Sequence, residues 1–142
     1  MRSHAVARIL GATLSLSLLF PIGARASSTL LFELVGEANR DRFGRAVIPM
    51  GLVDGDGVPD FLVTASFHDG PAGTDAGKAY LYSGATGAVI RTWDGLAANE
   101  LFGEFAASGD FDGDGVLDAA IGETAALGAP EIRIFSGATG AL

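Results

Sequence analysis

The sequence predicts an all-β fold made of four-stranded antiparallel units, the blades of a β-propeller, about two of which are present. Short apolar runs alternate with turns rich in glycine and aspartate, which is typical of β-strands joined by tight connections. The chain also repeats itself, because the pair Phe43-Gly44 recurs as Phe102-Gly103. After Ala26, no segment has a convincing helical pattern. Repeated four-stranded units of this period are typical of propeller blades.

Residues 1–26 have the pattern of a secretory signal peptide. Arg2 and Arg8 precede a mostly apolar stretch over 9–22, and Ala24-Arg25-Ala26 has the form of an Ala-x-Ala cleavage site. The apolar stretch is shorter than the roughly 20 residues that a membrane-spanning helix needs. We therefore expect cleavage after Ala26, secretion to the extracellular space or the periplasm, no transmembrane anchor, and a mature domain over 27–142.

The charge and the cysteine count exclude several functions. The formal net charge is −8, and it becomes −11 once the segment 1–26, which holds three arginines and no acid, is removed. Such a surface repels nucleic acid and anionic lipid, so neither is an expected partner. The chain has no cysteine, which excludes disulfides and thiol chemistry.

Each of the two repeats has the pattern of successive short strands. In the first repeat, about 40–98, apolar runs predict strands at 45–50, 61–65, 78–82 and 88–93. In the second repeat, about 99–142, they predict strands at 104–108, 119–122 and 131–135. The segment 29–35 aligns with 88–93 and is expected to be a closing strand without its own unit. The sequence Ser-Gly-Ala-Thr-Gly, at 83–87 and again at 136–140, predicts a hairpin turn.

An acidic loop in the second repeat has the pattern of a calcium site. Four carboxylates stand at positions 1, 3, 5 and 9 of the loop, and glycines at positions 4 and 6 allow a sharp turn. Ca²⁺ prefers about 6–8 oxygen ligands, so the carboxylates together with the carbonyl at position 7 suit it. The alternative is a plain acidic turn without an ion. The expected ligands are Asp110, Asp112, Asp114, Asp118 and the carbonyl of Val116.

The corresponding loop of the first repeat is a degraded version of this site. Position 1 is Leu52, which cannot bind a cation, so only Asp54, Asp56, Asp60 and the carbonyl of Val58 remain. An EF-hand is excluded in both loops, because position 12 is Val63 in one and Ile121 in the other, where that motif requires glutamate.

These motifs together resemble the FG-GAP repeat, which builds the N-terminal β-propeller of integrin α-subunits and occurs in many secreted bacterial proteins. The likeness covers nearly all of residues 30–142 and rests on the Phe-Gly pairs, the acidic loops and the Gly-x-aromatic-x-aromatic strand. It implies calcium as the cofactor, bound by the loop residues named above. The chain departs from the pattern after the second strand of each unit, where Thr64-Ala65-Ser66 and Gly122-Glu123-Thr124 replace Gly-Ala-Pro.

Two units are too few for a closed propeller, which typically needs about 4–8 blades. We therefore expect either a piece of a longer protein or an assembly of several copies. Open blades leave strand edges and apolar faces exposed, so self-association is a further expectation.

Little in the sequence indicates catalysis. His68, the one histidine after Ala26, lies in a Gly/Pro-rich loop, where we expect a solvated side chain. Tyr80, Tyr82 and Trp93 could form a platform for carbohydrate, but their strand positions favour packing. We expect a non-enzymatic module for binding, adhesion or scaffolding with an extracellular protein or carbohydrate. The alternative is a piece of an extracellular propeller-type hydrolase or lyase, since propellers also carry enzymes.

Overall fold

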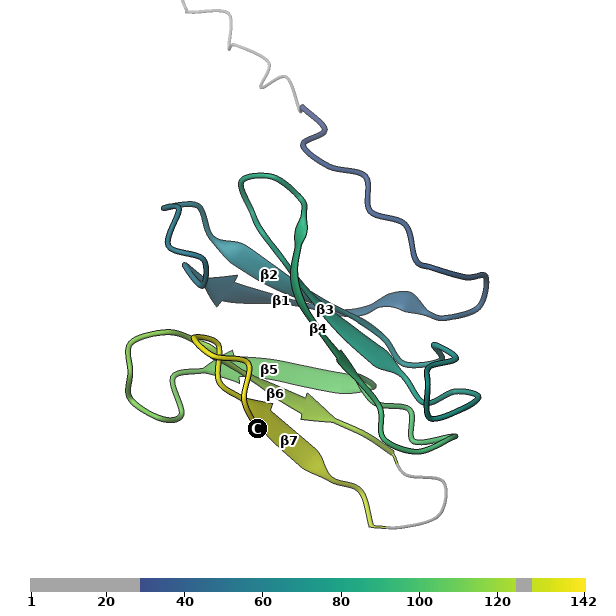
Figure 1. Cartoon of the computed structure of the whole chain (residues 1–142). Helices are drawn as coiled ribbons and strands as arrows, with labels where there is room; N and C mark the ends of the chain where they lie inside the picture. Colours follow the sequence, from purple (N-terminus) through teal and green to yellow (C-terminus); the bar gives the residue numbers. More distant parts are fainter. Residues whose placement is uncertain (1–28, 125–128) are drawn as a thin grey trace, which may run out of the picture. The chain divides into compact units, whose positions relative to one another are not determined.

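The computed structural model describes residues 29–124 and 129–142 (Figure 1). The predicted signal peptide therefore lies outside the described residues. The chain divides into two units, Met1–Leu30 and Leu31–Leu142, and all the described strands belong to the second unit. No helix in the described part is long and apolar enough to cross a membrane.

The second unit contains two antiparallel sheets, and no helix occurs in its described residues (Figure 1). Sheet one has the order β1-β2-β3-β4 and sheet two has the order β5-β6-β7. The strand bounds are β1 Phe43–Gly51, β2 Asp60–Ala65, β3 Lys78–Tyr82, β4 Val89–Asp94, β5 Phe105–Gly109, β6 Asp118–Gly122 and β7 Ile132–Phe135. The predicted all-β fold is confirmed. Each of these strands closely matches its predicted position at both ends.

The predicted strand at 29–35 is wrong, because the structure has no strand over residues 29–36. A closing strand needs the neighbouring strand of its own sheet, and no strand in the described part of the chain pairs with it. The segment instead packs by its side chains. Leu34 lies against a buried cluster on the outer face of sheet one, and Phe32 lies over Gly87.

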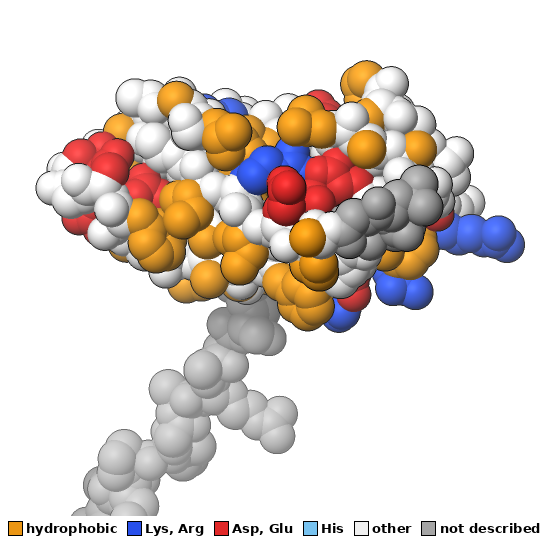
Figure 2. Space-filling view, turned by 90° about the horizontal axis from the view of Figure 1, so that it is seen from below, with side chains coloured by type: hydrophobic (Ala, Val, Ile, Leu, Met, Phe, Trp, Pro, Cys, Tyr) orange, Lys and Arg blue, Asp and Glu red, His pale blue; other side chains and the backbone are white. Residues whose placement is uncertain are grey.

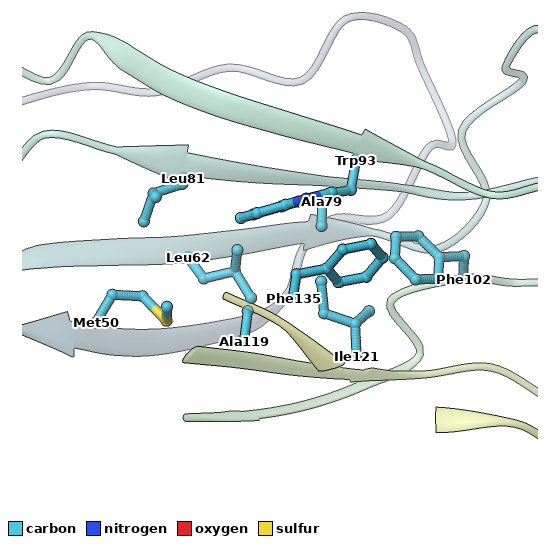
Figure 3. Packing of buried hydrophobic residues seen from close by; sticks show 9 residues of the cluster. All are labelled: Met50, Leu62, Ala79, Leu81, Trp93, Phe102, Ala119, Ile121 and Phe135. Carbon is cyan, nitrogen blue, oxygen red and sulfur yellow. The ribbon is translucent and has the colours of Figure 1, made fainter. Parts of the chain in front are cut away.

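The main hydrophobic core lies between the two sheets (Figure 3). Its residues alternate along the strands, so that each strand contributes side chains from one face. Burying each large side chain of this kind contributes roughly 1.5–3 kcal/mol. The cluster comprises Met50, Leu62, Ala79, Leu81 and Trp93 from sheet one, Phe102 from the connection, and Ala119, Ile121 and Phe135 from sheet two. The Phe102 side chain is fully buried there, between the two sheets.

A second cluster covers the opposite face of sheet one. Tyr80, Tyr82 and Val63 are buried there, with Phe43 and Leu34 packed against them. The Phe43 ring meets the Tyr80 ring edge-on, with centroids 5.6 Å apart. Tyr80, Tyr82 and Trp93 are therefore core residues, as their strand positions predict, and Tyr80 and Tyr82 form no exposed platform.

Candidate metal site

The two acidic loops fold in the same way, because glycine occupies the same positions in both. Gly113 and Gly115 have φ angles of 82° and 89°, and Gly55 and Gly57 have 78° and 89°. These angles lie in the left-handed region, which glycine enters without steric cost. The spacing of the glycines thus fixes a tight loop between β5 and β6 and an equivalent one between β1 and β2.

Each loop is held by its own carboxylates. The backbone N–H of Asp114 donates to Oδ1 of Asp112 at 3.0 Å, and the N–H of Val116 donates to Oδ1 of Asp114 at 2.8 Å. In such bonds the aspartate side chain itself closes a turn of the backbone that follows it. The first loop repeats them, since Asp54 and Asp56 accept the equivalent bonds at 3.0 and 2.8 Å.

Asp118, at the ninth position, is buried and anchors the second loop. One of its carboxylate oxygens accepts the N–H groups of Phe111 and Asp112 at 2.8 and 3.3 Å, and the other accepts the N–H of Gly137 at 2.9 Å. These donors, Gly137 foremost, hold the pKa of Asp118 below its ordinary value, although burial alone would raise it. The carboxylate is therefore charged, fixed and aimed into the loop.

Asp60 anchors the first loop through matching contacts. Its Oδ2 accepts the N–H groups of Val53 and Asp54 at 2.7 and 3.1 Å, and its Oδ1 accepts the N–H of Gly84 at 3.0 Å. The Ser-Gly-Ala-Thr-Gly turn of each repeat is thus tied to the acidic loop of the same repeat, a link that the linear sequence does not reveal.

Three carboxylates of the second loop converge. Asp110, Asp112 and Asp118 each offer an oxygen, and these oxygens lie within 4.8 Å of one another. Two oxygens bound to one Ca²⁺ at about 2.3–2.6 Å are at most about 5 Å apart, so this separation suits a shared ion. The donors are all hard oxygens, which fits Ca²⁺ better than a softer metal.

The structure does not place every expected ligand alike. Asp114 lies outside the group of three, although it follows in the same exposed loop. In the described part of the chain, Asp54, Asp56 and Asp60 do not form a corresponding group. The first position there is the exposed Leu52, so the first loop lacks the carboxylate that opens the group in the second.

His68 is buried, so the expectation of a solvated side chain is wrong. Its Nδ1 lies 3.0 Å from Oδ2 of Asp41, and its Nε2 lies 3.8 Å from the carboxylate of Glu37. The loop after β2 folds back onto residues 37–42, and the N–H of Phe67 donates to the carbonyl of Asp41 at 3.0 Å. The histidine and its acidic partners thus fasten the segment before β1 to this loop. These partners are distant from His68 in the sequence, so no local signal indicates the contact.

The two sheets and their glycine-aspartate loops define a protein built from propeller-type blades. The family model of the FG-GAP repeat matches residues 53–82, which contain the first acidic loop from its second position onward, β2 and β3. Residues 53–82 therefore form an FG-GAP repeat, as the sequence motifs indicate. No curated protein matches the chain.

Proposed function

We propose that this protein is an exported, calcium-stabilised FG-GAP module that serves binding, adhesion or scaffolding with an extracellular protein or carbohydrate. The observation that carries the calcium part is the convergence of Asp110, Asp112 and Asp118 within 4.8 Å. Without a cation, these like charges repel one another in the folded loop. A bound Ca²⁺ removes that repulsion, and so its binding energy stabilises the folded loop.

The proposed ligand set follows the loop. Asp110 and Asp112 contribute exposed carboxylates, and Asp118 contributes a carboxylate that backbone N–H groups already hold in place. Asp114 and the carbonyl of Val116 would complete the oxygen shell. Because Asp118 also binds Gly137, ion binding would reinforce the link between the loop and the turn after β7. We propose Asp54, Asp56, Asp60 and the carbonyl of Val58 as a weaker second site.

Calcium titration tests this proposal. Adding Ca²⁺ to chelator-treated protein should raise the melting temperature, and calorimetry should show saturable binding. A ligand that binds only the folded state stabilises it by about 2.7 kcal/mol at a hundredfold excess over Kd. Mg²⁺ should be a poor substitute, because it demands a tighter octahedron and releases its waters reluctantly. A melting temperature that ignores Ca²⁺ would contradict the calcium part.

A non-catalytic role is the second part of the proposal. Its support is chemical: the chain has no cysteine, and the acid-base pair of His68 with Asp41 is buried in contacts that hold two segments together. The alternative is part of an extracellular hydrolase or lyase. Turnover of an ester, phosphodiester or glycoside that disappears on single substitution of a pocket residue would overturn the non-catalytic role.

Export is the third part, and it rests on residues 1–26 alone. The arginines, the apolar stretch and Ala24-Arg25-Ala26 are in the order of a cleaved signal peptide. N-terminal sequencing of the protein from culture medium or periplasm should begin at Ser27. Recovery of the chain from the cytosol with Met1 intact would contradict this.

A further inference from the structure

The outer edge of β7 has no strand beside it in the described part of the chain. Sheet two ends at β7, whereas β3, the equivalent strand of sheet one, pairs with β4 along its whole length. The equivalence follows from the repeated turn, which begins directly after Tyr82 in β3 and after Phe135 in β7. The N–H and C=O groups on that edge are free to pair with an added strand.

One face of sheet two is apolar and exposed. Figure 2 shows this face from below, with hydrophobic side chains gathered across it. Phe105, Ile132 and Ile134 are 59%, 71% and 42% exposed, and a groove of about 430 Å³ lies over Phe105 and Ile132. The residues of β3 equivalent to Ile132 and Ile134 are Ala79 and Leu81, which are fully buried against sheet two. The face of sheet two that is exposed to solvent is thus the equivalent of the face that sheet one buries in the core.

The segment before β1 lies on sheet one as β4 lies on sheet two. Phe32 and Arg91 are as far apart in the sequence as Phe43 and Phe102, so they hold equivalent positions in the repeat. Gly87 and Gly140 are also equivalent, because each is the last residue of a Ser-Gly-Ala-Thr-Gly turn. The Phe32 side chain lies so close to Gly87 that an added Cβ would meet it at 2.7 Å. The Arg91 side chain lies over Gly140 in the same way, at 2.5 Å.

The next inward-facing position of the two segments also agrees. Leu34 packs against the cluster that contains Tyr82, while Trp93 packs against Phe135, with ring centroids 5.2 Å apart. Leu34 and Trp93 are again separated by the repeat interval. The segment over 31–35 therefore already occupies the position of a fourth strand, although no third strand of its sheet lies beside it in the described residues.

We propose that a second copy of this chain supplies that third strand. The outer edge of β7 of the second copy pairs with residues 31–35 of the first, in the register of β3 with β4, so that Ile132 lies opposite Leu34. The exposed face of sheet two then packs against the outer face of sheet one, where Val47 is 61% exposed and Phe61 is half-buried. Val47 is the equivalent of Ala106, which packs against the core between the sheets of one chain.

The contact is head-to-tail, because the two partners contribute different surfaces. It reproduces between chains the packing that joins sheet one to sheet two within a chain. Nothing in it requires the segment over 31–35 to leave its place, since Leu34 already covers sheet one as Trp93 covers sheet two. None of the acidic-loop carboxylates takes part, so the proposal stands whether or not the loops bind calcium.

Light scattering on the full purified chain, with surface variants, tests the head-to-tail contact. The unaltered chain should have a molar mass at least twice that of one chain at tens of micromolar. Ile134→Asp on sheet two and Val47→Asp on sheet one should each give monomers. An equimolar mixture of the two variants should give a 1:1 dimer, because each keeps the surface that the other has lost. Leu96→Asp, at a residue 74% exposed in the loop after β4, is the matched control and should leave the mass unchanged.

Disulfide trapping tests the strand pairing. Because the chain has no native cysteine, only the introduced cysteines can form crosslinks. Leu34→Cys and Ile132→Cys are made as two separate single variants and mixed under mild oxidation. A crosslinked heterodimer should exceed either homodimer several-fold.

An unaltered chain that stays monomeric would overturn the proposal. So would monomeric variants that fail to combine, or a Val47→Asp variant that still associates, which would indicate a symmetric contact between two copies of the sheet-two face. A crosslinked mixture without preference for the heterodimer would overturn the strand register.

Discussion

Replacing Gly84 by alanine is expected to lower the free energy of unfolding by about 3 kcal/mol or more. Gly84 is the second residue of the turn after β3, and an added Cβ would lie 1.8 Å from the carbonyl oxygen of Pro59. Neither the Cβ nor the Pro59 carbonyl can rotate away, because both are attached directly to the backbone. The turn would therefore have to move away from the acidic loop to relieve the clash. That movement would also break the bond from the Gly84 N–H to Asp60, leaving a buried carboxylate oxygen without its donor.

Gly55→Ala is the matched control for this prediction. Gly55 has a positive φ of +78°, unlike Gly84, and an added Cβ there meets nothing within 4 Å. The Gly55→Ala variant should therefore lose only about 1 kcal/mol of unfolding free energy, the backbone strain of a non-glycine residue at this φ. Urea denaturation can be followed by the fluorescence of Trp93, the single tryptophan, which is buried between the sheets. Equal losses in the two variants would mean that the contact between turn and loop contributes little.

The strands and the two loops were predictable because their signals are local. A run such as Phe61-Leu62-Val63 between turns indicates a strand whichever sheet it joins, and glycines on both sides of an aspartate fix the loop geometry. The hydrogen bond from the Gly137 N–H to the Asp118 carboxylate joins the turn after β7 to the start of β6. The sequence spacing does not reveal this bond. The sequence therefore shows which carboxylates could bind an ion, but not which of them the backbone holds.

The two wrong expectations concern contacts that depend on tertiary neighbours. Residues 29–35 have a strand pattern, yet a strand exists only where another strand pairs with it, and within the described residues none does. His68 lies in a loop of glycine and proline, yet Asp41 on a distant segment draws the ring into the interior. In both cases the local sequence pattern does not show which distant segment lies beside the residues, and that segment decides their structure.

Asp112→Asn is expected to abolish most of the stabilisation that calcium gives. Asp112 supplies one of the three converging oxygens, and the amide removes its charge at nearly unchanged size. Its side-chain oxygen can still accept the N–H of Asp114, so the loop should fold without the ion much as before. At a hundredfold excess of Ca²⁺ over the Kd of the unaltered protein, the loss should approach the full stabilisation of about 2.7 kcal/mol.

Asp54→Asn, the same change at the same position of the first loop, is the control. Asp54 likewise accepts one N–H, from Asp56, but it belongs to no converging group in the described part of the chain. Its variant should keep most of the calcium-dependent rise in melting temperature, because the first loop has Leu52 where the second has Asp110. Thermal melts of both variants with chelator and with Ca²⁺ make the comparison. If Asp54→Asn removed as much stabilisation as Asp112→Asn, the two loops would bind calcium equally and the missing first carboxylate would not matter.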